Sequence, residues 1–277
     1  MISQPGRFFN PIRGGIVPIS PVLANHPQLA LALTQFAGYN KKVAKVRRVT
    51  AADEVDVYSF RDSDGFYQTD SGWEDASAET LYLVEWYSQS GTNYAYQTVQ
   101  ADQPLLSWSL SDGWYLYLQG SGRTSDSVGQ FMYSNEVFSA QTVFCNFEVV
   151  GAGSLHFISG SSAAGSHGHL FIRGDTNYYM SVDGSAGNQG YIYRNNDAKL
   201  GPGGNLGTTE SILANQIASI GMTTANDIDQ DLLFAFTSAA TGRPNMRCRC
   251  FLSYPAALDE TTTRLDIHNL LMTQYGI

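Results

Sequence analysis

The sequence is short of charge and of long apolar runs, and each shortage excludes a class of protein. Only 15% of the residues are charged, which is low for a fold built from long solvated helices. No stretch approaches the roughly 20 apolar residues that span a bilayer, so we expect no membrane insertion. The opening residues MISQPGRFF also lack the apolar centre of a signal peptide. These features predict a soluble protein that does not use the general export route.

Cysteines and metal ligands are few as well. The three cysteines, Cys145, Cys248 and Cys250, cannot all form disulfides. We expect buried free thiols, with Cys248 and Cys250 side by side on one face of a strand. Zinc takes about four ligands, and the loop GSSAAGSHGH brings two histidines. Asp62 and Asp64 lack the full loop and distal Glu of a calcium site. The sequence therefore predicts no metal site and no cofactor.

Acidic residues are missing from the first 50 positions, although the whole chain has a net charge of −9. This leader carries +7, whereas the remaining residues carry −16. The two parts are expected to attract each other, or to attract the opposite charge of a partner. A mostly acidic surface argues against nucleic-acid binding by the whole domain, because neutralising phosphates needs a basic face.

Aromatic residues and glycines, in contrast, are plentiful. Aromatics make up 12% of the chain, with 16 Tyr, and there are 27 Gly. This balance is typical of short strands joined by many turns. The length of 277 residues suits either one large all-β domain with appendages or two small domains. Repeated short apolar runs, each bounded by Gly, Asn or Asp, predict an antiparallel sandwich or barrel.

Five of the nine prolines lie in the first 27 residues, among apolar side chains. Proline at this density prevents helix and ladder pairing, while the apolar residues disfavour a purely solvated tail. We interpret residues 1–27 as an extended docking arm laid against a partner. The expected docking side chains are Arg7, Phe8, Phe9, Ile12 and Arg13. An arm that wraps its own domain explains the same pattern equally well.

Residues 28–277 are predicted to form one β-sandwich domain, with leader elements over 28–137 and a more regular part over 138–277. A short helix is expected over residues 26–38, with Pro27 near its start and Gly38 at its end. KKVAKVRRV and EVDVYSF alternate as strands, and the turn SDG joins two more. In the regular part, VFCNFEVV places Val143, Cys145, Phe147 and Val149 on one face.

A second helix is predicted at the end of the chain. Asp259 or Thr261 is expected to cap it, and Gly276 to end it. Its apolar stripe consists of Leu265, Ile267, Leu270 and Leu271. We expect this helix to pack on the edge of the sandwich.

Three segments, in order, resemble a known family. The leader of arabinofuranosidase-like domains, a short helix before a basic Val-Arg-Arg strand, resembles ALALTQFAGYNKKVAKVRRVTAADEVDV. The Trp-Tyr-Asp-Gln-Ser-Gly-Asn block of the same proteins resembles WYSQSGTNYAYQTVQADQPLL. The end of concanavalin A-like lectin/glucanase domains resembles the tail FLSYPAALDETTTRLDIHNLLMTQYGI. The resemblance runs from about residue 29 to the last residue.

The resemblance implies a concanavalin A-like jelly-roll sandwich of antiparallel strands. Such domains are common among bacteriophage fibre, tail and head-decoration proteins, so it also implies a virion protein, assembled in the host cytoplasm, that meets a host surface glycan. Its expected partners are other virion proteins, bound through the arm, and further copies of itself. Because a fold does not fix a function, the chemistry has to be argued from side chains.

An enzymatic function lacks its residues. A retaining glycosidase needs two carboxyl groups about 5 Å apart, and the sequence nominates no such pair. Glu85 lies in a strand and Asp112 in a turn, while Ser88 stands where the family carries Asp. There is also no G-x-S-x-G elbow. We therefore name no catalytic residue and expect a non-enzymatic virion protein. An arabinofuranosidase-like glycoside hydrolase acting on host surface polysaccharide is the alternative.

Carbohydrate binding asks for an aromatic face with a few amide and hydroxyl groups beside it. The candidate residues are Trp73, Trp86, Tyr87, Gln89 and Trp114. Against them stands burial in the core, which we favour for Trp86 and Trp114 because alternate aromatics of a sandwich must face inward. Trp73 lies in the polar loop TDSGWEDAS and is the aromatic that we expect to be exposed.

Overall fold

The computed structural model describes residues 20–118, 130, 132–150, 158–159, 169–174, 178–182, 189–195, 216–228 and 245–277. The helices are α1 (Pro21–Ala24) and α2 (Thr263–Tyr275), with 3-10 turns at Ala76–Ala78 and Gln100–Asp102. The first ten strands are β1 (Leu29–Ala32), β2 (Ala44–Arg48), β3 (Asp53–Val57), β4 (Ser59–Arg61), β5 (Phe66–Thr69), β6 (Gly72–Asp75), β7 (Leu81–Tyr87), β8 (Tyr94–Tyr96), β9 (Leu105–Ser109) and β10 (Gly113–Leu118). The remaining strands are β11 (Tyr133–Ser134), β12 (Phe138–Val150), β13 (Ile158–Ser159), β14 (His169–Gly174), β15 (Tyr178–Val182), β16 (Gln189–Arg194), β17 (Gln216–Ile228) and β18 (Asn245–Tyr254).

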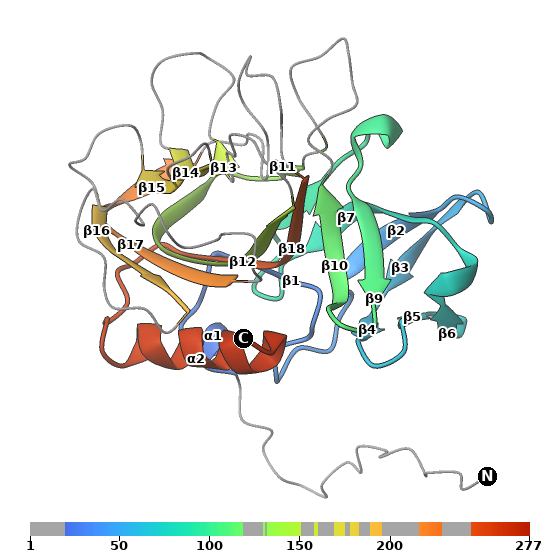
Figure 1. Ribbon diagram of the computed structural model, residues 1–277, viewed down its shortest axis with the longest axis horizontal. Coiled ribbons are helices and arrows are strands. Elements are labelled where there is room, and N and C mark those ends of the chain that lie inside the picture. The colour runs from blue at the N-terminus through green and yellow to red at the C-terminus, as the bar shows by residue number, and fades with distance from the viewer. Residues whose placement is uncertain are drawn as a thin grey trace, which may run out of the picture.

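Within the described part of the chain, twelve strands form one antiparallel sheet (Figure 1). Its path runs β11-β8-β7-β9-β10-β18-β12-β17-β16, with β1 pairing to β18, β2 to β7 and β3 to β2. Two small sheets, β4-β5-β6 and β13-β14-β15, complete the described strands. The predicted all-β antiparallel sandwich class is confirmed. The described residues contain no helix that is both long and apolar enough to cross a bilayer.

The larger hydrophobic cluster takes buried side chains from the main sheet and from β4 and β5. It joins Val46 and Leu83, from β2 and β7, to Val143, Cys145 and Phe147 of β12. Strands from 28–137 and from 138–277 thus enclose one core, because β10 pairs directly with β18. The inward alternation predicted for VFCNFEVV is confirmed at Val143, Cys145 and Phe147, whereas the side chain of Val149 lies outside the described ones.

A second cluster lies on the opposite face of β1, β12, β17 and β18 and is covered by α2 (Figure 1). The helix therefore packs across a sheet face. The predicted packing on the edge of the sandwich was wrong. Its buried positions are Arg264, Ile267, His268, Leu271, Met272 and Tyr275. Leu265 is 39% exposed, so the predicted stripe was wrong at that residue. Gly276 ends the helix in the left-handed conformation, with φ 68°, as predicted.

The helix predicted over residues 26–38 was wrong, because this segment contains β1, which pairs with β18 from Leu29↔Ser253 to Ala32↔Cys250. Leu29 faces the larger cluster, whereas Ala30 and Ala32 face the second. A strand that is buried on both faces gives a continuous apolar run, which periodicity cannot distinguish from a buried helix. The short N-terminal helix is α1, where the Ser20 hydroxyl accepts a hydrogen bond from the Val22 N–H at 3.3 Å.

The last residues of the predicted arm pack on their own domain. Val22 is completely buried, and its carbonyl accepts a hydrogen bond from the Tyr254 hydroxyl at 3.0 Å. The Ser20 N–H donates to the Ala37 carbonyl, also at 3.0 Å. The predicted docking residues Arg7, Phe8, Phe9, Ile12 and Arg13 lie outside the described residues.

The three cysteines are free and buried, as predicted, but Cys248 and Cys250 do not share a face. Cys248 belongs to the larger cluster and Cys250 to the second. A β-bulge in β18 places the two cysteines on opposite faces. Asn146 of β12 pairs with Cys250 and the next residue, Phe147, pairs with Cys248, so β18 has one extra residue at this point. Burial raises the pKa of Cys250 to about 12, which keeps this thiol protonated and unreactive.

The basic leader and the acidic remainder attract each other within the domain, one of the two outcomes that the charge pattern predicted. Lys42 pairs with Asp56 at 2.5 Å, and Lys45 with Glu85 at 3.3 Å. Arg48 pairs with Asp53, and this hydrogen bond lowers the pKa of the Asp53 carboxyl.

Candidate functional site

A row of four tyrosines lies on the outer face of β7, β8 and β11. It consists of Tyr87, Tyr94, Tyr96 and Tyr133, and we call it the tyrosine row. Successive ring centroids are 6.1, 5.9 and 5.7 Å apart. The rings face away from the core because Trp86 and Ala95, which alternate with them, are completely buried. All four side chains keep part of their surface exposed.

The β7–β8 hairpin sets the spacing of the row. Tyr87 lies opposite Tyr94 in this hairpin, and Tyr96 lies opposite Tyr133 of β11. Gly91, with φ 64°, allows the turn between β7 and β8. The Asn135 carboxamide oxygen accepts a hydrogen bond from the Tyr94 N–H at 2.7 Å, which ties β11 to β8. The rings are therefore carried by paired strands and not by a loose loop.

Each tyrosine of the row offers an apolar ring and a polar hydroxyl, the combination that aromatic sugar sites use. Burial raises the pKa of Tyr87 far above its ordinary value, and a hydrogen bond with Glu85 raises it further. The Tyr87 phenol therefore stays neutral at all physiological pH values. A neutral phenol can donate a hydrogen bond as well as accept one.

The predicted tryptophans divide as their sequence context indicated. Trp73 is 44% exposed, and the Arg61 guanidinium lies 4.7 Å from its ring centroid. Trp86 is completely buried and Trp114 is 2% exposed. These two residues belong to the larger cluster, so they present no surface to a sugar, and the core interpretation describes them correctly.

The predicted binding residue Gln89 serves the backbone. Its amide oxygen accepts from the Phe36 N–H at 2.7 Å, and its amide nitrogen donates to the carbonyls of Ala32 and Thr34 at 3.0 Å. Gln89 is only 4% exposed, and these hydrogen bonds direct its amide to the backbone, so the structure gives its side chain a role in the fold.

Ser88 also serves the fold. The Ser88 hydroxyl oxygen accepts a hydrogen bond from the Ala30 N–H at 2.8 Å, which joins the β7–β8 hairpin to β1. Ser88 is 4% exposed. This position therefore needs a small hydrogen-bond acceptor, and it does not face a substrate.

The structure brings together two carboxylates that the sequence did not pair. Asp112 and Glu148 both accept hydrogen bonds from Arg247 Nη1 at 3.2 Å. Hydrogen bonds from the Ser109 and Ser111 hydroxyls, together with the charge of Arg247, lower the pKa of the Asp112 carboxyl. A glycosidase needs one carboxyl group that holds a proton, whereas these contacts favour the ionised form of Asp112. The arrangement suits an ion pair better than an acid–nucleophile pair.

The two loop carboxylates considered for calcium have separate structural roles. Asp62 accepts a hydrogen bond from the Trp114 N–H at 2.8 Å, and Asp64 accepts one from Arg61 Nε at 2.7 Å. Among the described residues, no group of three or more His, Cys, Asp or Glu side chains is placed to hold a metal ion.

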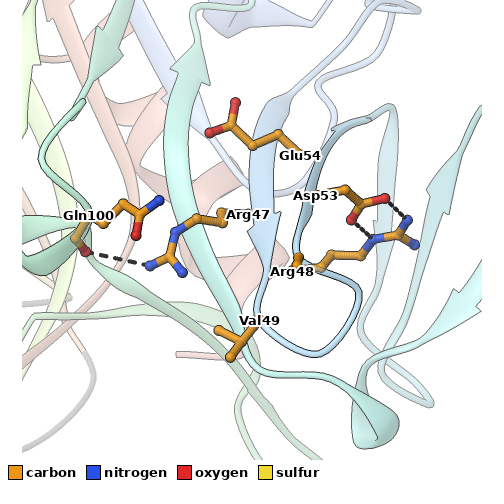
Figure 2. A pocket seen from close by; sticks show the side chains of 7 residues that line it. Arg47, Arg48, Val49, Asp53, Glu54 and Gln100 are labelled. Atoms are coloured by element: carbon orange, nitrogen blue, oxygen red, sulfur yellow. Dashed lines mark hydrogen bonds and ion pairs between the residues drawn. The ribbon is translucent and has the colours of Figure 1, made fainter.

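A hollow of about 400 Å³ lies at the end of the β2–β3 hairpin (Figure 2). Its lining is Arg47, Arg48, Val49, Ala52, Asp53, Glu54 and Gln100. Figure 2 shows Arg48 directed to Asp53 and Arg47 directed to Gln100, on opposite sides of β2. Arg48 and Asp53 form two parallel hydrogen bonds, of 2.7 and 2.5 Å, and so satisfy each other. Arg47 is thus the hollow's cation on the outer face of β2.

No family model and no curated protein matches the chain. Among solved structures, the chain is similar to a mutant GH54 α-L-arabinofuranosidase soaked with 4-nitrophenyl α-L-arabinofuranoside, at 10% identity and a TM-score of 0.43. The match covers 87% of this chain but 62% of that enzyme. A TM-score this low carries no argument about activity. The structure itself defines an all-β protein with a row of outward-facing tyrosines, and the concanavalin A-like form of its sandwich stays a prediction.

Proposed function

We propose that this chain is a non-enzymatic carbohydrate-binding protein and a structural component of a bacteriophage virion. The observation that carries the binding function is the tyrosine row, which is partly exposed and held on paired strands. The virion role is supported by the resemblance of the three sequence segments to arabinofuranosidase-like and concanavalin A-like domains, which are common among phage fibre, tail and head-decoration proteins. The glycoside hydrolase alternative has less support, because Asp112 and Glu148 share Arg247 as a hydrogen-bond donor and the pKa of the Asp112 carboxyl is lowered.

A purely structural role of the row is the competing explanation. Aromatic pairs across strands contribute roughly 0.2–1 kcal/mol each to the stability of a sheet. Such pairing does not require hydroxyl groups, because phenylalanine rings would pack in the same positions. The row instead has a hydroxyl on every ring, next to the Lys45–Glu85 ion pair. Polar groups beside rings are what recognition of sugar hydroxyls requires.

Replacing Tyr94 with alanine tests the binding function. We expect its affinity for the bound glycan to fall by about tenfold or more, because a central anchor of an interface typically contributes at least 1.4 kcal/mol. Tyr94→Phe keeps the ring and should retain part of the affinity. Binding to immobilised arabinan, dextran and bacterial O-antigen, measured by surface plasmon resonance, gives the comparison.

Tyr115→Ala is the matched control, since Tyr115 is a partly buried tyrosine on β10 whose ring lies 4.7 Å from the Arg247 guanidinium. It should leave glycan affinity unchanged. Equal affinity of Tyr94→Ala and the wild type would refute binding at the row. Release of reducing sugar by the wild type, lost in Asp112→Asn, would favour the hydrolase instead.

The proposed docking role of the arm calls for deletion of residues 1–19 and not of 1–27. Val22 is completely buried and its carbonyl bonds Tyr254, so a deletion that includes α1 would expose the second cluster. We expect the 1–19 deletion to retain the thermal stability of the full chain but to be lost from purified particles, as measured by immunoblotting. Normal incorporation of this shorter chain would refute docking through the arm.

A further inference from the structure

The tyrosine row is one part of a larger outer face. β2 pairs with β7 on the side away from β9, and β3 pairs with β2. Ala44 and Val46 of β2 point into the core, so Lys45 and Arg47 between and beyond them point outward. Val57 of β3 is likewise completely buried, which places Asp56 on the outer side. Five adjacent strands, in the order β11-β8-β7-β2-β3, thus carry aromatic and polar side chains on the same side.

The middle of this face connects the rings to the charged residues. Tyr87, at one end of the row, forms a hydrogen bond with Glu85, which pairs with Lys45 at 3.3 Å. On the next strand, Asp56 pairs with Lys42 at 2.5 Å. Each charge here has a partner of opposite sign, so this part of the face is polar but neutral.

The far end of the face is the hollow of Figure 2. The Arg47 guanidinium lies 4.6 Å from the centroid of the Tyr82 ring, and its Nε donates to the Gln103 amide oxygen at 2.7 Å. These contacts hold a planar hydrogen-bond donor in one orientation. Glu54 supplies an acceptor in the same hollow, and Val49, which is 46% exposed, supplies an apolar surface. A donor, an acceptor and an apolar surface together match the groups of a sugar ring.

The dimensions and the charge of the face select the ligand. Neighbouring strands are about 4.8 Å apart, so five strands span about 19 Å from β11 to β3, which is longer than one sugar ring. The basic residues Lys42, Lys45 and Arg47 are balanced by Glu54, Asp56 and Glu85. A balanced face gives no electrostatic preference for an acidic chain. α1 and α2 both pack with the second cluster, away from these strands.

We propose that this face binds an extended, uncharged polysaccharide that crosses β11, β8, β7, β2 and β3, with the tyrosine row and the Arg47 hollow as two contact regions on one chain. This inference rests on the proposed carbohydrate-binding function and adds to it the length, charge and path of the ligand. One chain that touches two regions binds more tightly than a fragment that touches one, because the second contact becomes intramolecular.

The test compares chain lengths on variants of both regions. The probes are linear arabinan and dextran, the disaccharide and hexasaccharide of each, and polygalacturonate as an acidic polymer, with affinities measured by calorimetry. We expect the affinity for hexasaccharide or polymer to be at least about tenfold higher than the affinity for disaccharide. Polygalacturonate should bind more weakly than the neutral polymers. Arg47→Ala and Glu54→Ala should each weaken polymer binding severalfold and reduce the advantage of the longer chain.

Two controls protect the interpretation. Arg61→Ala removes an arginine that stacks on Phe66 and Trp73 outside the face, and it should leave polymer binding unchanged. Glu54 has an exposed side chain, so Glu54→Ala should fold even if loss of the Arg47–Gln103 hydrogen bond impairs the folding of Arg47→Ala.

The outcomes separate the two proposals. If Tyr94→Ala weakens binding but Arg47→Ala and Glu54→Ala do not, the ligand stays on the tyrosine row and the extended path is wrong. Equal affinity for disaccharide and polymer would also overturn it. If no probe binds the wild type, the carbohydrate-binding function fails. Self-association that Tyr94→Ala abolishes, measured by sedimentation, would identify a second copy of the chain as the occupant and overturn both.

Discussion

Trp114→Ala is expected to lower the free energy of unfolding by about 3–5 kcal/mol, the usual cost of removing a large aromatic side chain from a packed core. Trp114 is 2% exposed. Its ring centroid lies 4.9 Å from that of Phe60 and 6.1 Å from that of Tyr67. Its indole Nε1 also donates a hydrogen bond to the Arg61 carbonyl at 3.2 Å. The substitution leaves a cavity and removes one of the two hydrogen bonds that the Arg61 carbonyl accepts, the other of which comes from the Gly65 N–H at 3.1 Å.

Urea unfolding, followed by tyrosine fluorescence and circular dichroism, measures this loss. The control is Trp73→Ala, which removes a side chain that is 44% exposed. It forfeits the contact with Arg61, which is worth about 0.5–1 kcal/mol at an exposed site. At temperatures where Trp114→Ala is folded, we expect it to bind glycan normally. Wild-type stability with lost glycan binding would place Trp114 in the binding site and contradict its assignment to the core.

The strands that sequence analysis identified are those with one buried face. KKVAKVRRV and EVDVYSF alternate because Val46 and Val57 enter the core, while Lys45 and Asp56 face solvent. Local alternation is sufficient evidence in such cases. β1 is different, because both of its faces are buried once α2 covers the second cluster. That covering involves residues more than 200 positions away, so no local pattern could report it.

The candidate site shows the same division. Trp73, which lies in β6, could be predicted as exposed because its segment is polar, and Trp86 as buried because it alternates with the partly exposed Glu85 and Tyr87. The pattern Tyr94-Ala95-Tyr96 was a local signal of two outward rings that the sequence analysis did not use. Tyr133 could not be added to them without the pairing of β11 with β8.

The bulge in β18 and the carboxylate pair also depend on pairing between distant segments. The bulge appears only in the register of β18 against β12, so the sequence alone placed Cys248 and Cys250 on one face. Asp112, in the turn before β10, and Glu148, in β12, both reach Arg247 because β10 and β12 both pair with β18, which carries this arginine. Pairing between distant strands determines these features, and local patterns in a single sequence do not predict that pairing.

Beneath α2, a buried polar chain of hydrogen bonds makes stability depend on pH. His268 is 1% exposed, and its Nε2 lies 2.7 Å from the Asn195 carbonyl oxygen. A carbonyl can only accept, so Nε2 carries the proton and the neutral Nδ1 accepts from the Ser219 hydroxyl at 3.0 Å. Arg264 Nη1 donates to the same hydroxyl oxygen at 3.4 Å. A proton added to Nδ1 would remove the acceptor for the Ser219 hydroxyl and place a second positive charge beside a buried guanidinium.

The pKa of His268 is accordingly lowered from 6.5 to about 4, first by burial and then by the charge of Arg264, against the opposing hydrogen bond to Asn195. In the unfolded chain the imidazole takes up a proton below about pH 6.5, but in the folded protein it does so only below about pH 4. Stability contributed by neutral His268 is therefore complete above pH 6.5 and is lost as the pH falls toward 4. Between pH 7.5 and 5.0 we expect a loss of about 2 kcal/mol from this group.

Urea unfolding of the wild type and of His268→Gln at pH 7.5 and 5.0 tests this dependence. A glutamine amide offers one acceptor and one donor to the same partners but does not titrate, so the variant should lose less stability between these two pH values. The interval stays above the range in which Asp112 and Asp259, whose pKa values are lowered by hydrogen bonds, become protonated. Since α2 covers the second cluster, its amides should lose hydrogen-exchange protection first as the pH falls. An equally large loss in His268→Gln would assign the effect to another group and show that the buried imidazole does not control the attachment of α2.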